Sequence, residues 1–182
     1  MYYEYDGSGF LNKIKDHNGV IVESITYNHT EGENQHKVSQ ATDSLGCVVN
    51  YSYDMLNKKT TITDMNNRVS TYWFDSSMYT IKVQYPDGRY TLTEYYIYGG
   101  KNKYGDIRSF TDRNGNRTEY NIDSIGNVIK KINCADNSSS EYGYDDKNNL
   151  IWEKDECGIC TYYIFDEDKI NLIKRVQPLN GT

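Results

Sequence analysis

One short phrase returns along this chain at nearly fixed spacing: an aromatic residue, any residue, a second aromatic or apolar residue, and then aspartate. The aspartates of successive clear copies lie 48, 21, 48, 22 and 21 residues apart. A period of about 20–50 residues marks a repeat architecture, in which one small unit stacks on its neighbours. The sequence therefore predicts a repeat array. The clear copies are Tyr3-Glu4-Tyr5-Asp6, Tyr51-Ser52-Tyr53-Asp54, Tyr72-Trp73-Phe74-Asp75, Tyr120-Asn121-Ile122-Asp123, Tyr142-Gly143-Tyr144-Asp145 and Tyr163-Ile164-Phe165-Asp166.

A second pattern, Asp-x-x-Gly or Asp-x-x-Asn, predicts the turns. Aspartate favours the first position of a type I turn, where its carboxylate bonds nearby backbone N–H groups. A following Gly or Asn tolerates the left-handed conformation that closes a three-residue hairpin loop with a bulge. Tyr85-Pro86-Asp87-Gly88 predicts a related turn, because proline presets φ at the second position. The pattern occurs at Asp6–Gly9, Asp16–Gly19, Asp43–Gly46, Asp54–Asn57, Asp64–Asn67, Asp112–Gly115, Asp123–Gly126, Asp145–Asn148 and Asp155–Gly158.

These turns recur every 10 or 11 residues where the pattern is clean, which leaves about six or seven residues for each strand. Short strands joined by tight turns form antiparallel hairpins. We therefore predict an all-β, tandem-repeat antiparallel β-hairpin meander of about sixteen strands that forms a curved or spiralling sheet. Alternation is visible in places: Tyr51 and Tyr53 share one face, as do Leu150 and Trp152.

Composition is compatible with a folded domain although aliphatic residues are few. Leu, Ile, Val and Phe make up 36 of 182 residues, close to the level of about 20% below which disorder is expected. The net charge of −6 is small, and 19 tyrosines supply apolar area suited to a half-buried sheet. We predict one repeat domain over 1–182. Irregular insertions are expected near 29–42 and 99–110, where polar residues interrupt the rhythm.

Charge and hydropathy exclude some classes of partner. The acidic balance and the scattered Lys and Arg argue against nucleic acid, because phosphate binding needs clustered basic residues. No apolar run approaches the roughly 18 residues of a membrane span, so no span is expected. The first residues show neither a basic start nor an apolar stretch, so no signal peptide is visible.

The residues that could carry chemistry have simpler structural explanations. Cys157-Gly158-Ile159-Cys160 has redox or zinc spacing, yet it falls on an Asp-x-x-Gly turn, and Cys47 and Cys134 stand alone. The pattern favours turn and strand residues over a functional pair. We assign no catalytic, cofactor-binding or metal-binding residue and expect no cofactor.

The histidines and the aspartates lead to the same conclusion. His17, His29 and His36 lack catalytic or metal-binding spacing, and a solvated loop is favoured for the segment 29–36. Asp166-Glu167-Asp168 is the nearest approach to a calcium loop, but the turn pattern already explains the aspartates. The tyrosines allow two interpretations: an exposed row could stack on sugar rings, whereas an inward row would form the core and cross-strand pairs. Their register with the repeat favours the second.

The pattern Tyr-x-Tyr-Asp-x-x-Gly, followed by apolar residues, Asp-x-x-Gly and another Tyr-x-Tyr-Asp, resembles the YD repeat of the RHS (rearrangement hotspot) proteins. The copies that resemble it best span 3–27, 51–75, 120–145 and 142–166. The resemblance implies an antiparallel β-strip that spirals into a hollow shell, as in bacterial toxin complexes, polymorphic toxins, wall-associated proteins and teneurins. Larger members carry an Asp-Pro-rich self-cleavage segment. Pro86 and Pro178 do not follow aspartate, so we transfer no cleavage activity and no toxin domain.

We therefore expect a non-enzymatic RHS/YD-repeat module, a partial shell or scaffold segment of a bacterial secreted or cell-surface, toxin-related protein. Before export it would be cytoplasmic. Because an open sheet leaves unpaired backbone groups at its edges, the expected partners are further repeats, another protein or a second copy of the chain. The alternative is a module that binds carbohydrate or a host ligand through exposed tyrosines.

Overall fold

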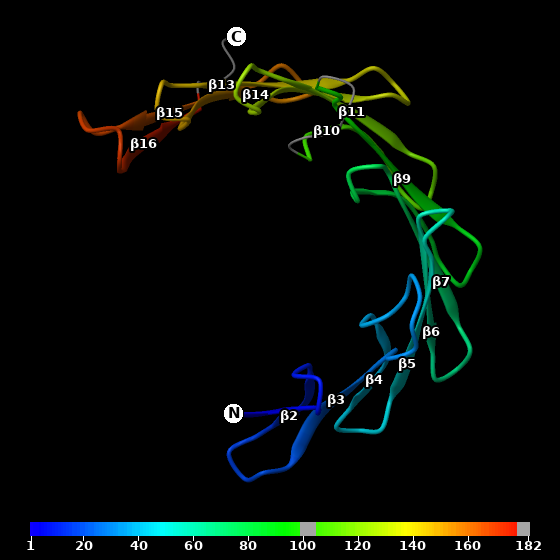
Figure 1. Ribbon diagram of the computed structural model, residues 1–182. Helices are drawn as coiled ribbons and strands as arrows, with labels where there is room; N and C mark the ends of the chain where they lie inside the picture. The colour runs from blue at the N-terminus through cyan, green and yellow to red at the C-terminus, as the bar shows by residue number, and fades with distance from the viewer. Residues whose placement is uncertain (99–104, 178–182) are drawn as a thin grey trace. The chain divides into compact units, whose positions relative to one another are not determined.

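The computed structural model describes residues 1–98 and 105–177, and these residues form strands and turns without a helix (Figure 1). The strands in this described part of the chain number sixteen, in agreement with the roughly sixteen that the turn spacing predicted. Their bounds are β1 Tyr2–Tyr5, β2 Leu11–Lys15, β3 Ile21–Tyr27, β4 Val38–Asp43, β5 Val48–Asp54, β6 Lys59–Asp64, β7 Val69–Phe74, β8 Thr80–Gln84, β9 Tyr90–Tyr95, β10 Ile107–Thr111, β11 Arg117–Ile122, β12 Val128–Asn133, β13 Ser139–Tyr144, β14 Leu150–Lys154, β15 Cys160–Phe165 and β16 Leu172–Val176.

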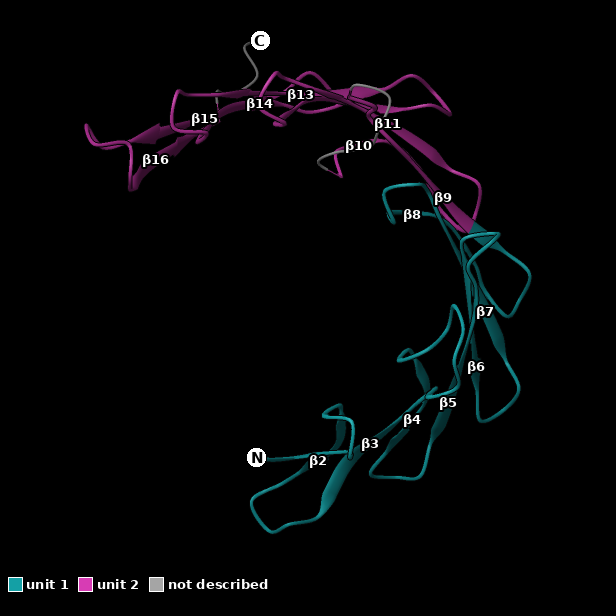
Figure 2. Ribbon diagram, in the orientation of Figure 1, with its two compact units in different colours: residues 1–90 teal, residues 91–182 magenta. Residues whose placement is uncertain are grey.

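The chain divides into two compact units, residues 1–90 and 91–182, each of which is a one-layer strip of strands (Figure 2). In unit 1 the strands from β1 to β8 lie in chain order, and each pairs antiparallel with the next. Unit 2 repeats this arrangement from β9 to β16. The predicted all-β hairpin meander is confirmed. That residues 1–182 form a single domain remains a prediction, since the structure divides into these two units.

Aspartate organises the turns as the sequence predicted. The Asp112 Oδ1 atom accepts hydrogen bonds from the backbone N–H groups of Asn114 (2.8 Å) and Asn116 (2.9 Å). Gly115 donates its N–H to the Asp112 carbonyl and has φ of 88°. One carboxylate thus satisfies two N–H groups that the ladder leaves unpaired. The same pair of hydrogen bonds, from the N–H groups two and four residues later, occurs at Asp6, Asp16, Asp43, Asp64, Asp75, Asp123, Asp145 and Asp155.

Three turns depart from the predicted chemistry. The left-handed residue after Asp54 is Lys58 (φ 48°), not the predicted Asn57, because the loop holds four residues between the paired Asp54 and Lys59. The turns after Asp75 and Asp166 are closed by Met78 (φ 66°) and Lys169 (φ 56°). The spacing of 10 or 11 residues predicted turns at Asp75 and Asp166, but it did not predict these closing residues, because neither is Gly or Asn.

Most odd-numbered strands end opposite a β-bulge, because the strand that follows carries one extra residue where the register shifts. The register shifts between Glu4 and Tyr5, and again between Gly143 and Tyr144. A bulge bends the strand that carries it and disrupts the regular ladder there. The aromatic or apolar residues directly after these shifts are Tyr5, Tyr27, Phe74, Ile122, Tyr144 and Phe165.

The irregular stretches are shorter than expected where the structure describes them. The first is a loop over residues 28–37, because β4 begins at Val38. In the second, β10 begins at Ile107, and residues 99–104 lie outside the described part of the chain. The last strand, β16, runs from Leu172 to Val176, and residues 178–182 lie outside the described part of the chain.

The sheet lacks a conventional core. Among the described residues no hydrophobic side chain is buried; the buried residues are Thr91, Ser109 and Thr161. A globular domain of this length buries most of the surface that its unfolded chain exposes. Here both faces of a single layer stay partly open. Stability must therefore come mainly from the ladder, the turns and contacts between neighbouring strands.

Gly143 is required by a close contact across one such strand pair. It lies opposite Trp152 in the register of β13 and β14. A Cβ atom added to Gly143 would lie 1.9 Å from the Trp152 Nε1 atom. The indole ring therefore lies over the glycine backbone, and no other residue type fits without moving that ring.

We predict that Gly143→Ala lowers the free energy of unfolding by about 1–3 kcal/mol, because the methyl group displaces Trp152. Urea denaturation monitored by tryptophan fluorescence measures the change. Gly7→Ala is the matched control, because nothing lies within 4 Å of its added Cβ. Equal midpoints for the two variants would contradict the contact.

The turn carboxylates also predict a dependence of stability on pH. The pKa of Asp112 lies below its ordinary value of 3.8, chiefly because the Asn116 side chain donates to the carboxylate. Hydrogen bonds that favour the charged form lower a pKa. Further aspartates with a lowered pKa are Asp6, Asp43, Asp54, Asp64, Asp123, Asp145 and Asp166.

Because these carboxyls bind protons more weakly in the folded chain, their stabilisation is complete above pH 3.8 and is lost as the pH falls through the lowered values. We expect the urea concentration at the unfolding midpoint to decrease as the pH is lowered from neutral to about 3. Asp112→Asn keeps an acceptor oxygen without the titration, so its profile should be flatter than that of the parent chain. Identical profiles would contradict the role of Asp112.

Candidate functional site

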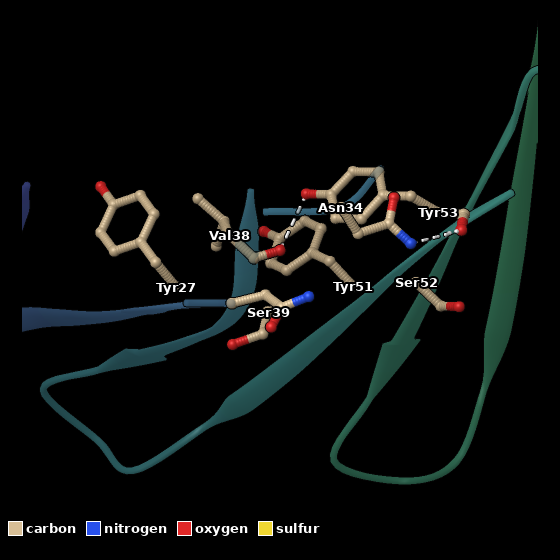
Figure 3. Close-up of a pocket in the computed structure, with 8 residues that line it drawn as sticks. Tyr27, Asn34, Val38, Ser39, Tyr51, Ser52 and Tyr53 are labelled. Carbon is tan, nitrogen blue, oxygen red and sulfur yellow. Dashed lines mark hydrogen bonds between the residues drawn. The ribbon is translucent and has the colours of Figure 1, made fainter. Parts of the chain in front are cut away.

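The odd-numbered strands of unit 1 all end at one border of the sheet, which we call the tyrosine border. Its turns are residues 6–9, 28–37, 54–59 and 75–79. A hollow of about 290 Å³ lies here, where β3, β4 and β5 meet the loop 28–37 (Figure 3). Its lining consists of Tyr27, Asn28, Asn34, Val38, Ser39, Tyr51, Ser52 and Tyr53.

Hydrogen bonds hold the walls of this hollow in place. The Tyr53 hydroxyl donates to the Val38 carbonyl (2.8 Å), and the Asn34 side-chain amide donates to the Tyr53 carbonyl (3.1 Å), as Figure 3 shows. Ser39 donates its hydroxyl to the carbonyl of Thr26 (3.1 Å). The Asn34 side chain thus ties the loop 28–37 to β5. Sequence reasoning missed Asn34 and Ser39, because nothing in the repeat marks them.

The bond from Tyr53 belongs to a repeated arrangement. Tyr27 donates to the Leu11 carbonyl and Tyr144 to the Val128 carbonyl, each at 3.0 Å. In each case a tyrosine at the end of one strand reaches the first carbonyl of the preceding strand. The tyrosines were expected to form a core and cross-strand aromatic pairs; at these positions they instead link strands from hydroxyl to backbone, and no hydrophobic side chain of the described residues is buried. Burial raises the pKa of the Tyr53 and Tyr144 hydroxyls.

An aromatic cluster adjoins the hollow. The Phe10 ring centroid lies 5.0 Å from those of both Tyr27 and His36. His29 lies 6.2 Å from His36 in an edge-on arrangement, and its Nε2 atom is 3.3 Å from the Asp6 carboxylate. The loop expected to be merely solvated therefore packs two imidazoles against the sheet border. Spacing could not reveal this, because Phe10 comes from another hairpin.

The cysteines occupy the places that the turn pattern predicted. The Asp155 Oδ1 atom accepts from the N–H groups of Cys157 (2.9 Å) and Ile159 (2.8 Å), and Cys160 begins β15. All four thiols are free. Cys157 is exposed, whereas Cys47, Cys134 and Cys160 are half-buried. The interpretation of Cys157 and Cys160 as turn and strand residues is confirmed.

The acidic run Asp166-Glu167-Asp168 lies in the turn between β15 and β16. The Asp166 Oδ1 atom accepts from the Ile170 N–H at 2.8 Å, so this carboxylate closes the turn. Over residues 1–98 and 105–177, no cluster of three or more His, Cys, Asp or Glu side chains could hold a metal ion. No helix of that part of the chain is long and apolar enough to cross a membrane.

The chemistry of the hollow suits binding. Its lining offers hydroxyls, amides and aromatic rings, and it contains no carboxylate, imidazole or thiol. Most of the polar atoms already bond to the main chain. The arrangement positions a loop on the sheet border and leaves a shallow polar recess beside it.

Comparisons with known proteins identify the fold. No protein-family model and no curated protein matches the chain. Among solved structures, the chain is similar to part of the Photorhabdus luminescens Tc holotoxin pore, with a TM-score of 0.61 and 14% identity over 86% of this chain. It is also similar to the TcdB2-TccC3 complex with Cdc42 (TM-score 0.62, 12% identity, 96% covered) and to TcdB2-TccC3 itself (0.59, 12%, 97%). The matches span only 9%, 11% and 13% of those chains. At such identities the likeness shows the fold alone.

We predict that Tyr53→Phe lowers the free energy of unfolding by about 0.5–1.5 kcal/mol, because the Val38 carbonyl loses its donor. Thermal or urea denaturation measures the loss. Tyr51→Phe is the matched control: Tyr51 lines the same hollow, and its hydroxyl bonds to no group in residues 1–98 and 105–177. If both variants unfold at the same midpoint, the Tyr53 bond does not stabilise the border.

Proposed function

We propose that this chain is a non-enzymatic RHS/YD-repeat structural module, a shell or scaffold segment of a bacterial secreted or cell-surface, toxin-related protein. One observation carries the proposal. Over the described residues each unit is a single layer of strands, and no hydrophobic residue is buried. Such a layer is suited to form part of a wall, because each hairpin contacts only its neighbours and the strip can be extended.

The fold likeness supports this role. The solved structures with similar strips are parts of Tc toxin assemblies, and this chain corresponds to about a tenth of each of their chains. The repeated Tyr-x-Tyr-Asp phrase, in register with the hairpins, supports assignment to the YD/RHS repeats. A position outside the bacterial cell follows from that assignment and forms part of the proposal.

The strands at the two ends of the strip favour a protein partner. In β1, Tyr2, Tyr3 and Tyr5 are exposed, and in β16, Leu172 and Ile173 are exposed. Within residues 1–98 and 105–177, β1 and β16 each pair with one strand only, and a strand with a free edge can accept a further strand. We propose further repeats, another protein or a second copy of this chain as the occupant.

The carbohydrate alternative is less well supported. Several tyrosines that could present a sugar-binding surface instead donate their hydroxyls to backbone carbonyls, namely Tyr27, Tyr53, Tyr96 and Tyr144. We therefore retain the structural module as the proposed function.

The edge-pairing part of the proposal predicts self-association that depends on β16. Light scattering should show a mass that rises with protein concentration, and Ile173→Lys should suppress the rise, because an edge charge disfavours strand addition. Ile125→Lys is the matched control: Ile125 is 68% exposed, like Ile173 at 66%, but lies in a turn. A mass that does not change with concentration, or that responds equally to both variants, contradicts pairing through this edge.

A further inference from the structure

A second hollow lies on the tyrosine border of unit 1, between the β5–β6 and β7–β8 turns, and measures about 280 Å³. Its walls are apolar and come from Tyr53, Met55, Phe74 and Met78. Three lysines, Lys37, Lys58 and Lys59, stand at the same hollow. Adaptable methionine side chains are common on surfaces that accept a partner.

Two of these residues hold an unfavourable backbone conformation. Lys58 and Met78 have φ of 48° and 66°, in the left-handed region that long side chains avoid. At the opposite border of unit 1, the left-handed turn residues are Gly19, Gly46, Asn67 and Gly88. Glycine would relieve the strain at positions 58 and 78. The chain instead keeps a cation and a thioether there, and both line the hollow. Strain retained at one place points to a use for the side chains.

The charges at the hollow favour an anion. The Lys37 ammonium is held by the Glu33 carbonyl (3.0 Å) and the Asn34 side-chain oxygen (3.2 Å), and it lies over the Tyr53 ring. Lys59 lies 3.7 Å from Asp54. In residues 1–98 and 105–177, the Lys58 ammonium has no hydrogen-bond or ion-pair partner. Three cations thus surround an apolar hollow in a chain whose net charge is −6.

We propose that this hollow binds an acidic segment of a partner polypeptide, with one large apolar side chain in the hollow and flanking carboxylates on the lysines. The hollow is smaller than the roughly 300–1,000 Å³ of sites for drug-sized ligands, and its size suits a single side chain. Carboxylates beside that side chain would complement Lys58 and its neighbours. The choice of a polypeptide rests on the proposed scaffold function, whereas the apolar and cationic character of the site does not.

The probe is a fluorescent peptide in which one phenylalanine is flanked on each side by two glutamates. Fluorescence anisotropy should show that it binds the full chain, and that Met78→Gly and Lys58→Gly each weaken binding about tenfold. Both variants should unfold at the same or a higher urea concentration than the parent, because glycine relieves the left-handed strain. Asn67→Gly is the matched control: it alters a left-handed residue (φ 59°) at the opposite border and should leave binding unchanged.

Four results would overturn the inference. They are no binding by the parent chain, equal binding of a peptide with alanine in place of phenylalanine, equal binding of a peptide with lysines in place of glutamates, and unchanged affinity in Met78→Gly. Binding of dodecanoate or of phosphatidylserine vesicles in place of the peptide, with the same dependence on Met78, would assign the hollow to a lipid and also reject it. If the peptide does not bind this hollow, the proposed self-association through β16 is unaffected. The two experiments therefore test the hollow and the scaffold function separately.

Discussion

The carboxylate of the turn aspartate, which accepts two backbone N–H groups, is the interaction on which the rest of this structure depends. At Asp112 it bonds the second and the fourth residue that follow, and eight other aspartates do the same. Each such turn reverses the chain over a few residues and sets the register of its hairpin. Strand length then follows from turn spacing. At Asp112, Asp6, Asp43, Asp64, Asp123 and Asp145 these bonds favour the charged carboxylate, which couples the fold to pH.

A sheet assembled in this way holds together without a buried apolar centre. Neighbouring strands exchange ladder bonds, tyrosine hydroxyls satisfy carbonyls where the ladder ends, and ions pair across strands. In unit 2, Arg117 of β11 lies between Glu94 of β9 (3.0 Å) and Glu119 of its own strand (3.2 Å). Lys130 and Glu141 pair at 3.0 Å across β12 and β13. Exposed pairs of this kind contribute little singly, so the strip depends on many small local contacts.

The sequence was sufficient for the hairpins and insufficient for the hollows. Asp-x-x-Gly turns and Tyr-x-Tyr-Asp phrases are local, so backbone preferences at each copy predicted strand number and order. Spacing predicted the turn at Asp75, but not its closing residue Met78, because a side chain in the left-handed conformation is tolerated there only in the folded context. Phe10 packs on His36, and Lys58 and Phe74 line one hollow, only because particular hairpins are neighbours and their strand ends have particular orientations. Periodicity carries no information on those contacts.

Successive turns lie alternately at the two borders of the sheet, and this alternation limits how such a chain can lengthen or shorten during evolution. Each aspartate that follows an aromatic pair lies where an odd-numbered strand ends, and the simpler turns lie at the other side. Duplicating a segment of 21 residues, the shortest step between aromatic phrases, adds two strands and leaves every later turn on its own side. Gain or loss of one strand would reverse the direction of all that follow and exchange the two sides. Genes for this architecture should therefore lengthen by whole hairpin units.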